Sequence, residues 1–221
     1  MTMQRIALVR AMFLVIVAAA LTGCAQSAPD KNTFAMMVKM PAVEGHRVDA
    51  DLHVAPVNVL RPYSGRSFVY RVGENRFELD YYNQFVASPS DLLTGLVAQS
   101  LADHGLFRAV VMGNEGLAPT YHLETTITEL AGDYRKASAP AGVIAARFIV
   151  VRDDADGSHI AGQWTFEESV PAKDHTPKAL VDAWDQAMEK VLARLGEELA
   201  KLPPDAAKAS PQSGESSAVP R

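Results

Sequence analysis

Three long stretches in the second half of the chain have the residue pattern of β-strands, and this pattern constrains the fold most. Residues 121–128 alternate strictly, as in a strand with one exposed face. Residues 143–151 are apolar on both faces except for Arg147, which predicts a central strand. A polar turn over 153–157 leads into residues 160–170, which alternate again. The pattern therefore predicts a sheet of long antiparallel strands.

Shorter strands are expected in the first half of the chain. Residues 48–60 are largely apolar, but Pro56 breaks their phase, which indicates an edge strand or a bulge. Two aromatic-rich runs, 67–72 and 76–82, are separated by Gly-Glu-Asn and predict a hairpin. The run 107–112 predicts one more short strand before the long ones.

Two amphipathic helices complete the expected fold. Ser88, Pro89 and Asp91 form a helix start, and an apolar stripe at helical spacing follows as far as Gly105. The second helix begins at Thr176. Its apolar residues recur in steps of three and four: Leu180, Trp184, Met188, Val191, Leu195, Leu199 and Leu202. The sequence thus predicts an α+β fold, a two-layer sandwich in which a mainly antiparallel mixed sheet carries two helices on one face. The expected order is β-β-β-α-β-β-β-β-α.

The N-terminus has the organisation of a secretory signal. Arg5 and Arg10 precede an apolar run over 11–21. This run is too short to cross a membrane, because a spanning helix needs about 20 apolar residues. The string Leu-Thr-Gly-Cys then ends at Cys24, the only cysteine, and resembles the lipobox of bacterial lipoproteins. The resemblance implies that Cys24 is lipidated and begins the mature chain. Ala25 stands where an Asp commonly retains such proteins at the inner membrane, so we expect the periplasmic face of the outer membrane.

Four segments are expected along the chain. Residues 1–23 form the signal peptide, and residues 24–35 form a linker from the lipidated cysteine. Residues 36–202 form the folded domain, which is large enough for a core of its own. Residues 203–221 are rich in Pro, Ser and Ala, so we expect a disordered tail there.

The sequence contains no set of residues that would support catalysis or hold a cofactor. One cysteine excludes a disulfide within the chain and a cysteine-rich zinc site. The 6 histidines lack the zinc-protease spacing, and no nucleophile elbow or phosphate loop is present. The net charge of −5 does not favour nucleic acid. We expect no enzyme activity, no catalytic residues, no metal site, no cofactor and no nucleic-acid partner.

The predicted hairpin holds the one cluster with binding potential, a group of aromatic side chains. Aromatic side chains in such a position most often pack in a core, but tyrosines with a solvated end also suit a partner surface. Both alternatives remain open from the sequence. Tyr70, Arg71 and Tyr81 are the predicted partner-binding residues. The aromatic cluster consists of Phe68, Tyr70, Phe77, Tyr81, Tyr82 and Phe85.

Several strings, taken in order, resemble the auxiliary lipoproteins of ABC-type transport systems, the PqiC-like group. They are the lipobox at Cys24, Phe-Val-Tyr-Arg over 68–71, Phe-Val-Ala-Ser-Pro over 85–89, and Trp-Thr-Phe over 164–166 before the terminal helix. The resemblance covers the chain from about residue 48 to the end of that helix. It implies a non-enzymatic periplasmic component of an ABC transporter. Its implied partners are the permease, the ATPase and an MCE-domain protein, which together carry phospholipid or other hydrophobic molecules between the membranes.

Two other functions remain open from the sequence. One is a structural lipoprotein of another outer-membrane assembly complex, held by the same anchor. The other is a lipid-anchored hydrolase, which the missing nucleophile–base pair disfavours. A homo-oligomer is also compatible with the sequence. In each case the acyl chains provide the anchor, because an acidic chain is not attracted to anionic lipid by its charge.

Overall fold

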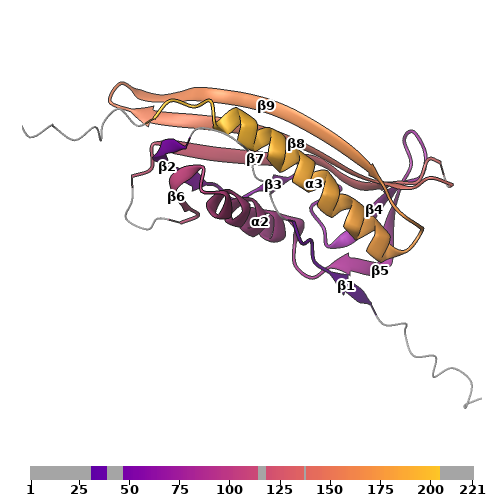
Figure 1. Cartoon of the computed structure of the whole chain (residues 1–221). Helices are drawn as coiled ribbons and strands as arrows, with labels where there is room; N and C mark the ends of the chain where they lie inside the picture. The colour runs from indigo at the N-terminus through magenta and orange to yellow at the C-terminus, as the bar shows by residue number, and fades with distance from the viewer. Residues whose placement is uncertain (1–30, 39–46, 114–117, 137, 205–221) are drawn as a thin grey trace, which may run out of the picture. The chain divides into compact units, whose positions relative to one another are not determined.

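The computed structural model describes residues 31–38, 47–113, 118–136 and 138–204 (Figure 1). The expected signal peptide, the lipidation site Cys24 and residues 205–221 of the expected tail lie outside the described residues. No helix in the described part of the chain is long and apolar enough to cross a membrane. The folded part described below begins at Lys31, the first residue of the larger of two compact units.

The three longest strands of the described sheet pair in antiparallel orientation, each with the next along the chain. They are β7 (Tyr121–Asp133), β8 (Ala141–Asp154) and β9 (Gly157–Pro171). The strand β8 lies between the other two, as its two apolar faces predict. Its buried positions line up with those of β7, since Val150 is directly opposite Leu123. The predicted central strand is therefore confirmed.

Shorter strands pair with β7 at both of its ends and make the sheet mixed. At its start, β7 pairs in parallel with β2 (Val48–Val54), which in turn pairs with β6 (Phe107–Val111). At its end, β7 pairs in parallel with β4 (Ser67–Arg71), followed outward by β5 (Phe77–Phe85). The predicted hairpin is confirmed as β4 and β5. Two minor strands are also parallel to their neighbours: β1 (Asn32–Phe34) against β5 and β3 (Asn58–Val59) against β7.

The first helix, α2 (Pro89–His104), forms where the capping residues predict it. The Ser88 hydroxyl accepts a hydrogen bond from the backbone N–H of Asp91, which satisfies one of the free N–H groups at the helix start. Gly105 ends the helix with a φ of 68°, a left-handed conformation that glycine adopts without strain. The helix packs against β6, β2 and β3.

The second helix, α3 (Pro177–Leu199), begins after Thr176, whose hydroxyl accepts from the Ala179 N–H. It runs along β8 and β9 (Figure 1). Val54 of β2, Leu123 of β7 and Val150 of β8 form one aligned, fully buried row. Both helices pack on this face of the sheet, so the α+β two-layer fold is confirmed.

Trp184 of α3 is the largest fully buried side chain in the described core. Its ring packs against Phe68 at 4.9 Å and Phe85 at 5.4 Å between centroids. Its indole N–H donates to the Ala131 carbonyl at 2.9 Å. Gly142 of β8 permits this approach, since a Cβ there would lie 2.9 Å from the Trp184 backbone nitrogen. The helix thus contacts the sheet closely along the stripe that its sequence predicts.

The element order differs from the prediction in the first half of the chain. Among the described residues, five strands precede α2 instead of three. One addition is β1, which lies inside the stretch 24–35 that was expected to be linker. The other arises near Pro56, where the run 48–60 divides into β2 and β3 because proline cannot donate a ladder hydrogen bond. Three residues of β1 and two of β3 are too few to give a periodic signal.

The far ends of the domain differ from the prediction in detail. The helix α3 ends at Leu199, although Leu202 beyond it remains buried with 7% of its surface exposed. Pro203, expected at the start of the tail, accepts a hydrogen bond from the Tyr121 hydroxyl through its carbonyl at 2.7 Å. The fold therefore continues at least to this contact.

Asp185 on α3 should make the stability of the fold depend on pH. Burial raises the pKa of its carboxyl to about 6, although the Met37 backbone N–H donates to it at 3.0 Å and opposes the shift. The pKa of Asp185 is higher in the folded state than the reference value of 3.8. Its contribution to the stability of the fold is therefore fully present below pH 3.8 and is lost as the pH rises through about 6.

Asp185→Asn should remove this dependence while keeping an oxygen acceptor for Met37. Between about pH 4 and about pH 7, the wild-type free energy of unfolding should fall by about 1–2 kcal/mol relative to the variant, with a discount for the partial exposure of the group. Urea denaturation at both pH values measures the difference. Glu197→Gln, at an exposed carboxylate of the same helix, is the matched control. Equal pH profiles for wild type and Asp185→Asn would contradict the prediction.

Candidate partner interface

The β4–β5 hairpin carries the three predicted partner-binding residues. Val69 lies opposite Leu79, and Arg71 lies opposite Phe77, so these four side chains share one face. Tyr70 lies opposite Glu78 on the other face. Tyr81 lies further along β5, after an irregularity in the register. Tyr70 and Arg71 are thus neighbours on β4 whose side chains point to opposite faces, and Tyr81 lies apart from both.

Asp80 holds the irregular part of β5 in shape. Its carboxylate accepts hydrogen bonds from the Tyr70 hydroxyl, the backbone N–H groups of Tyr82 and Asn83, and the Asn83 side chain. Burial raises the pKa of Asp80, but these hydrogen bonds outweigh it and the net pKa is lowered. Burial and the bond to Asp80 together raise the pKa of Tyr70 far above its ordinary value. The polar end of Tyr70 is therefore occupied within the domain.

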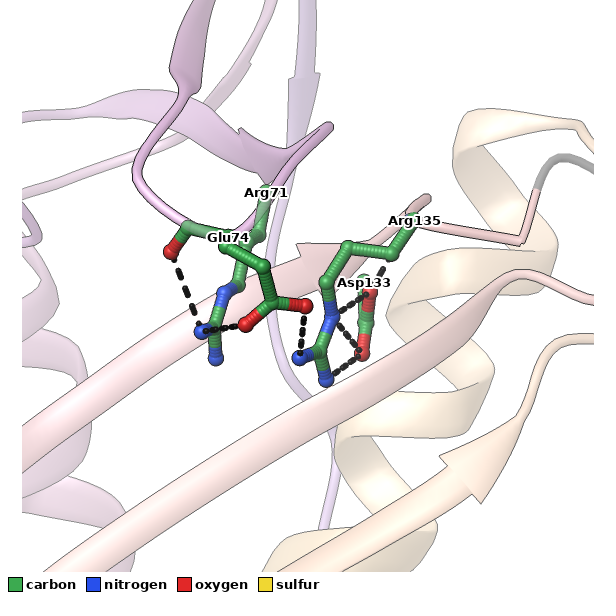
Figure 2. A network of polar contacts seen from close by, with 4 residues as sticks. All are labelled: Arg71, Glu74, Asp133 and Arg135. Carbon is green, nitrogen blue, oxygen red and sulfur yellow. Dashed lines mark hydrogen bonds and ion pairs between the residues drawn. The ribbon is translucent and has the colours of Figure 1, made fainter.

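A polar network ties the turn of the hairpin to the end of β7 (Figure 2). Glu74 in the turn accepts from Arg135 at 3.3 Å and forms an ion pair with Arg71 at 3.6 Å. Arg135 also binds Asp133 through Nη2 at 2.6 Å and through Nε at 3.0 and 3.1 Å. The Glu74 side chain is 79% exposed, so the pairs that it forms add little to stability. The network instead presents two positive and two negative groups on one surface.

Arg71 differs from Glu74, its partner in this network, because most of its side chain is buried. Only 25% of the side chain is exposed, and its Nε lacks a hydrogen-bond partner among the described residues. Burial raises the pKa of nearby Glu129, while the charge of Arg71 lowers it. The charge of Arg71 therefore acts on two carboxyls, the half-buried one of Glu129 and the exposed one of Glu74.

The aromatic cluster divides into a buried part and an exposed part. Phe68 and Phe85 belong to the core against Trp184. Tyr70 is half-buried and packs its ring on Tyr134 at 5.1 Å. The exposed members lie on β5: Phe77, Tyr81 and Tyr82. Packing in the core thus holds for Phe68 and Phe85. A partner surface stays a prediction for the exposed members.

A histidine pair on the other end of the sheet was not predicted. His53 and His122 lie opposite each other on β2 and β7, with 3.4 Å between their Nδ1 atoms. The Nε2 of His122 is 2.9 Å from an Asp153 carboxylate oxygen. The alternation over 121–128 predicted one exposed face of the strand but not this pair. Across the described residues, no group of three or more His, Cys, Asp or Glu side chains could hold a metal ion.

A family model for the ABC-type transport auxiliary lipoprotein component matches residues 35–196. The match covers most of the chain and nearly the whole described domain. The chain belongs to this family. The auxiliary lipoprotein is thus a component of ABC-type transport, and the family is one of envelope lipoproteins that are not known as enzymes. The resemblance found in the sequence is confirmed at the level of the family.

Two solved structures support the fold of this auxiliary lipoprotein. A Xanthomonas campestris protein of the DUF330 family is 21% identical, with a TM-score of 0.67 over 76% of this chain and 95% of that one. An uncharacterized protein is 14% identical, with a TM-score of 0.61 over 77% and 99%. PelC from Paraburkholderia phytofirmans, solved as a dodecamer, is 12% identical with a TM-score of 0.42 over 69% and 95%. No curated protein matches the chain.

Proposed function

We propose that this auxiliary lipoprotein is anchored through Cys24 on the periplasmic face of the outer membrane and serves a transporter of phospholipid or another hydrophobic molecule. Its direct partner would be an MCE-domain protein, and the permease and the ATPase of the same system would complete the complex. Family membership over residues 35–196 is the observation that supports the transport role. The lipobox-like string at Cys24 and the Ala25 that follows it support the anchor and the membrane.

The turn end of the β4–β5 hairpin is the surface that we propose for the partner. Tyr70 and Arg71 remain the predicted contact residues. Glu74 joins them because it pairs with Arg71 and exposes 79% of its side chain. Exposed charges of both signs contribute more to the orientation of a bound partner than to its affinity, since complementary charges set register and association rate. Tyr81 lies beyond Asp80 and belongs to a second surface, treated below, which adjoins the first at Phe77, the residue opposite Arg71.

A crosslinking pull-down from intact cells tests this proposal. Wild-type protein should recover the MCE-domain protein, and Glu74→Arg should reduce the recovery several-fold because it reverses a charge at the proposed contact. Tyr70→Ala should weaken recovery as well, through loss of the ring beside Tyr134. Glu197→Arg makes the same charge change on an exposed position of α3 and should have no effect.

Recovery of a different set of proteins would change the conclusion. If wild-type protein recovered only components of an outer-membrane assembly machine, the transport partner would be wrong and the structural alternative would replace it. If the MCE-domain protein were recovered equally with Glu74→Arg, the proposed surface would be wrong while the partner remained. Thermal unfolding of each variant confirms that a loss of recovery is not a loss of folding.

A further inference from the structure

Large hydrophobic side chains that remain exposed gather near one edge of the sheet. Four of them lie on β5, and we call these four the β5 patch: Phe77, Leu79, Tyr81 and Tyr82. Val86 follows β5, and Met37 follows β1, the strand that pairs with β5; Leu60 follows β3, which pairs with β7. In the described residues only Met112 and Ile160 are exposed large hydrophobics elsewhere. An apolar grouping of this kind marks a contact surface.

The bulge at Asp80 makes β5 unusually rich in outward-facing aromatic side chains. In a regular strand, neighbouring residues point to opposite faces. Here the rings of Tyr81 and Tyr82 contact each other in a T-shaped pair, with 5.2 Å between centroids. Both are exposed, at 64% and 46%. The strand β1 pairs only with the end of β5, so within the described residues no strand covers the outer edge of 77–82.

The chain from the proposed anchor enters the fold directly beside this patch. Lys31, which precedes β1, places its ammonium 4.6 Å from the centre of the Tyr81 ring. Eight residue steps separate Cys24 from Asn32, the first residue of β1. Even fully extended, they reach at most about 29 Å. The β5 patch must therefore stay close to any membrane that holds a lipidated Cys24.

The chain between Cys24 and β1 does not hold the opposite edge of the sheet near the membrane. The strands β4 and β2 pair with β7 at residues 132–133 and 121–123, so they lie about 30 Å apart along that strand. Met112 follows β6, which pairs with β2 at the distant end. Most of the exposed hydrophobic groups thus lie at the end that the tether holds near the lipid.

We infer that the β5 patch contacts the surface of the bilayer that holds the Cys24 anchor. Tyrosine suits this position because its ring can enter the apolar boundary while its hydroxyl stays among the head groups. Leu79 and Phe77 add apolar surface, and the ammonium of Lys31 can reach lipid phosphate. The contact gives the acyl anchor a second attachment and fixes which edge of the domain faces the membrane. The inference rests on the proposed lipid anchor.

Fluorescent labels on the mature lipoprotein test this orientation. Leu79→Cys and Ile160→Cys each add one free thiol, because acylation blocks the sulfur of Cys24; the two replaced side chains are 65% and 61% exposed. Each protein is labelled with an environment-sensitive dye and reconstituted in vesicles of phosphatidylethanolamine with a minority of phosphatidylglycerol. The label at 79 should shift to the blue and be quenched several-fold more by brominated lipid than the label at 160.

The outcomes separate this inference from the anchor on which it rests. The mass of each purified protein reports whether Cys24 carries acyl chains, and a protein without them would overturn both proposals. Acylated protein whose label at 79 is as accessible to water as the label at 160 would overturn the membrane contact alone. A label at 79 that responds only when the MCE-domain protein is added would also overturn it, since the patch would then be a protein interface.

Discussion

Trp184→Ala should destabilise the auxiliary lipoprotein by about 3–5 kcal/mol. The side chain is fully buried and packs against Phe68 and Phe85, so its loss leaves a cavity between α3 and the sheet. It also removes the indole N–H from the buried carbonyl of Ala131, a loss that costs about 1–3 kcal/mol when the acceptor stays unpaired. Since whole domains are stable by only about 5–15 kcal/mol, the variant should melt far below the wild type.

Two further variants make the result interpretable. Trp184→Phe keeps an aromatic ring but loses the N–H donor, so it should fall between the wild type and Trp184→Ala. Gln186→Ala, two residues along α3 at an exposed position, should leave the unfolding midpoint almost unchanged. Chemical denaturation followed by circular dichroism measures all three. A midpoint for Trp184→Ala within error of the wild type would contradict the close packing of α3 on the sheet.

Cys24→Ala should remove nearly all of the protein from the outer-membrane fraction. The variant lacks the thiolate that is the nucleophile for acylation, and the remaining acidic chain has no strong electrostatic attraction to lipid. The contact proposed for the β5 patch is too small to hold the domain alone, since stable anchoring takes more than one signal. Cell fractionation with an antibody to the folded domain should find the variant in the soluble fraction or as an uncleaved precursor.

Ala25→Asp is the matched control for the anchor. It leaves Cys24 in place, so acylation should continue, but it introduces the residue that commonly retains lipoproteins at the inner membrane. The protein should then move from the outer to the inner membrane fraction without becoming soluble. Outer-membrane fractionation of Cys24→Ala that equals the wild type would exclude the anchor, and an unchanged position of Ala25→Asp would exclude sorting by that residue.

The strands and helices that were predicted well are those whose signals lie close together in the chain. Ser88 and Asp91 cap α2 across three residues, and the stripe on α3 repeats every three or four. By contrast, β1 and β3 are held by partners 51 and 68 positions away, Asn83 for Asn32 and Thr126 for Asn58. Their own residues carry too little pattern to show this pairing.

The candidate interface was predicted less completely than the fold. The hairpin was correct, but the sequence could not distinguish Phe68 and Phe85, which contact Trp184, from Tyr81 and Tyr82, which face solvent. Periodicity fails here because Asp80 bends β5 and shifts the alternation. Glu74 was expected only as part of a turn, yet in the fold it connects that turn to Arg135, 61 residues away.

The sequence by itself determined the α+β class, the long central strand, the helix starts and the absence of recognisable catalytic motifs. These follow from hydrophobic period and capping chemistry, which act within a few neighbouring residues. Only the tertiary structure decided which side chains of β5 are exposed, that Lys31 lies over Tyr81, and that His53 meets His122. Such contacts join segments tens of residues apart, and their geometry depends on strand order and bulges that local patterns do not specify.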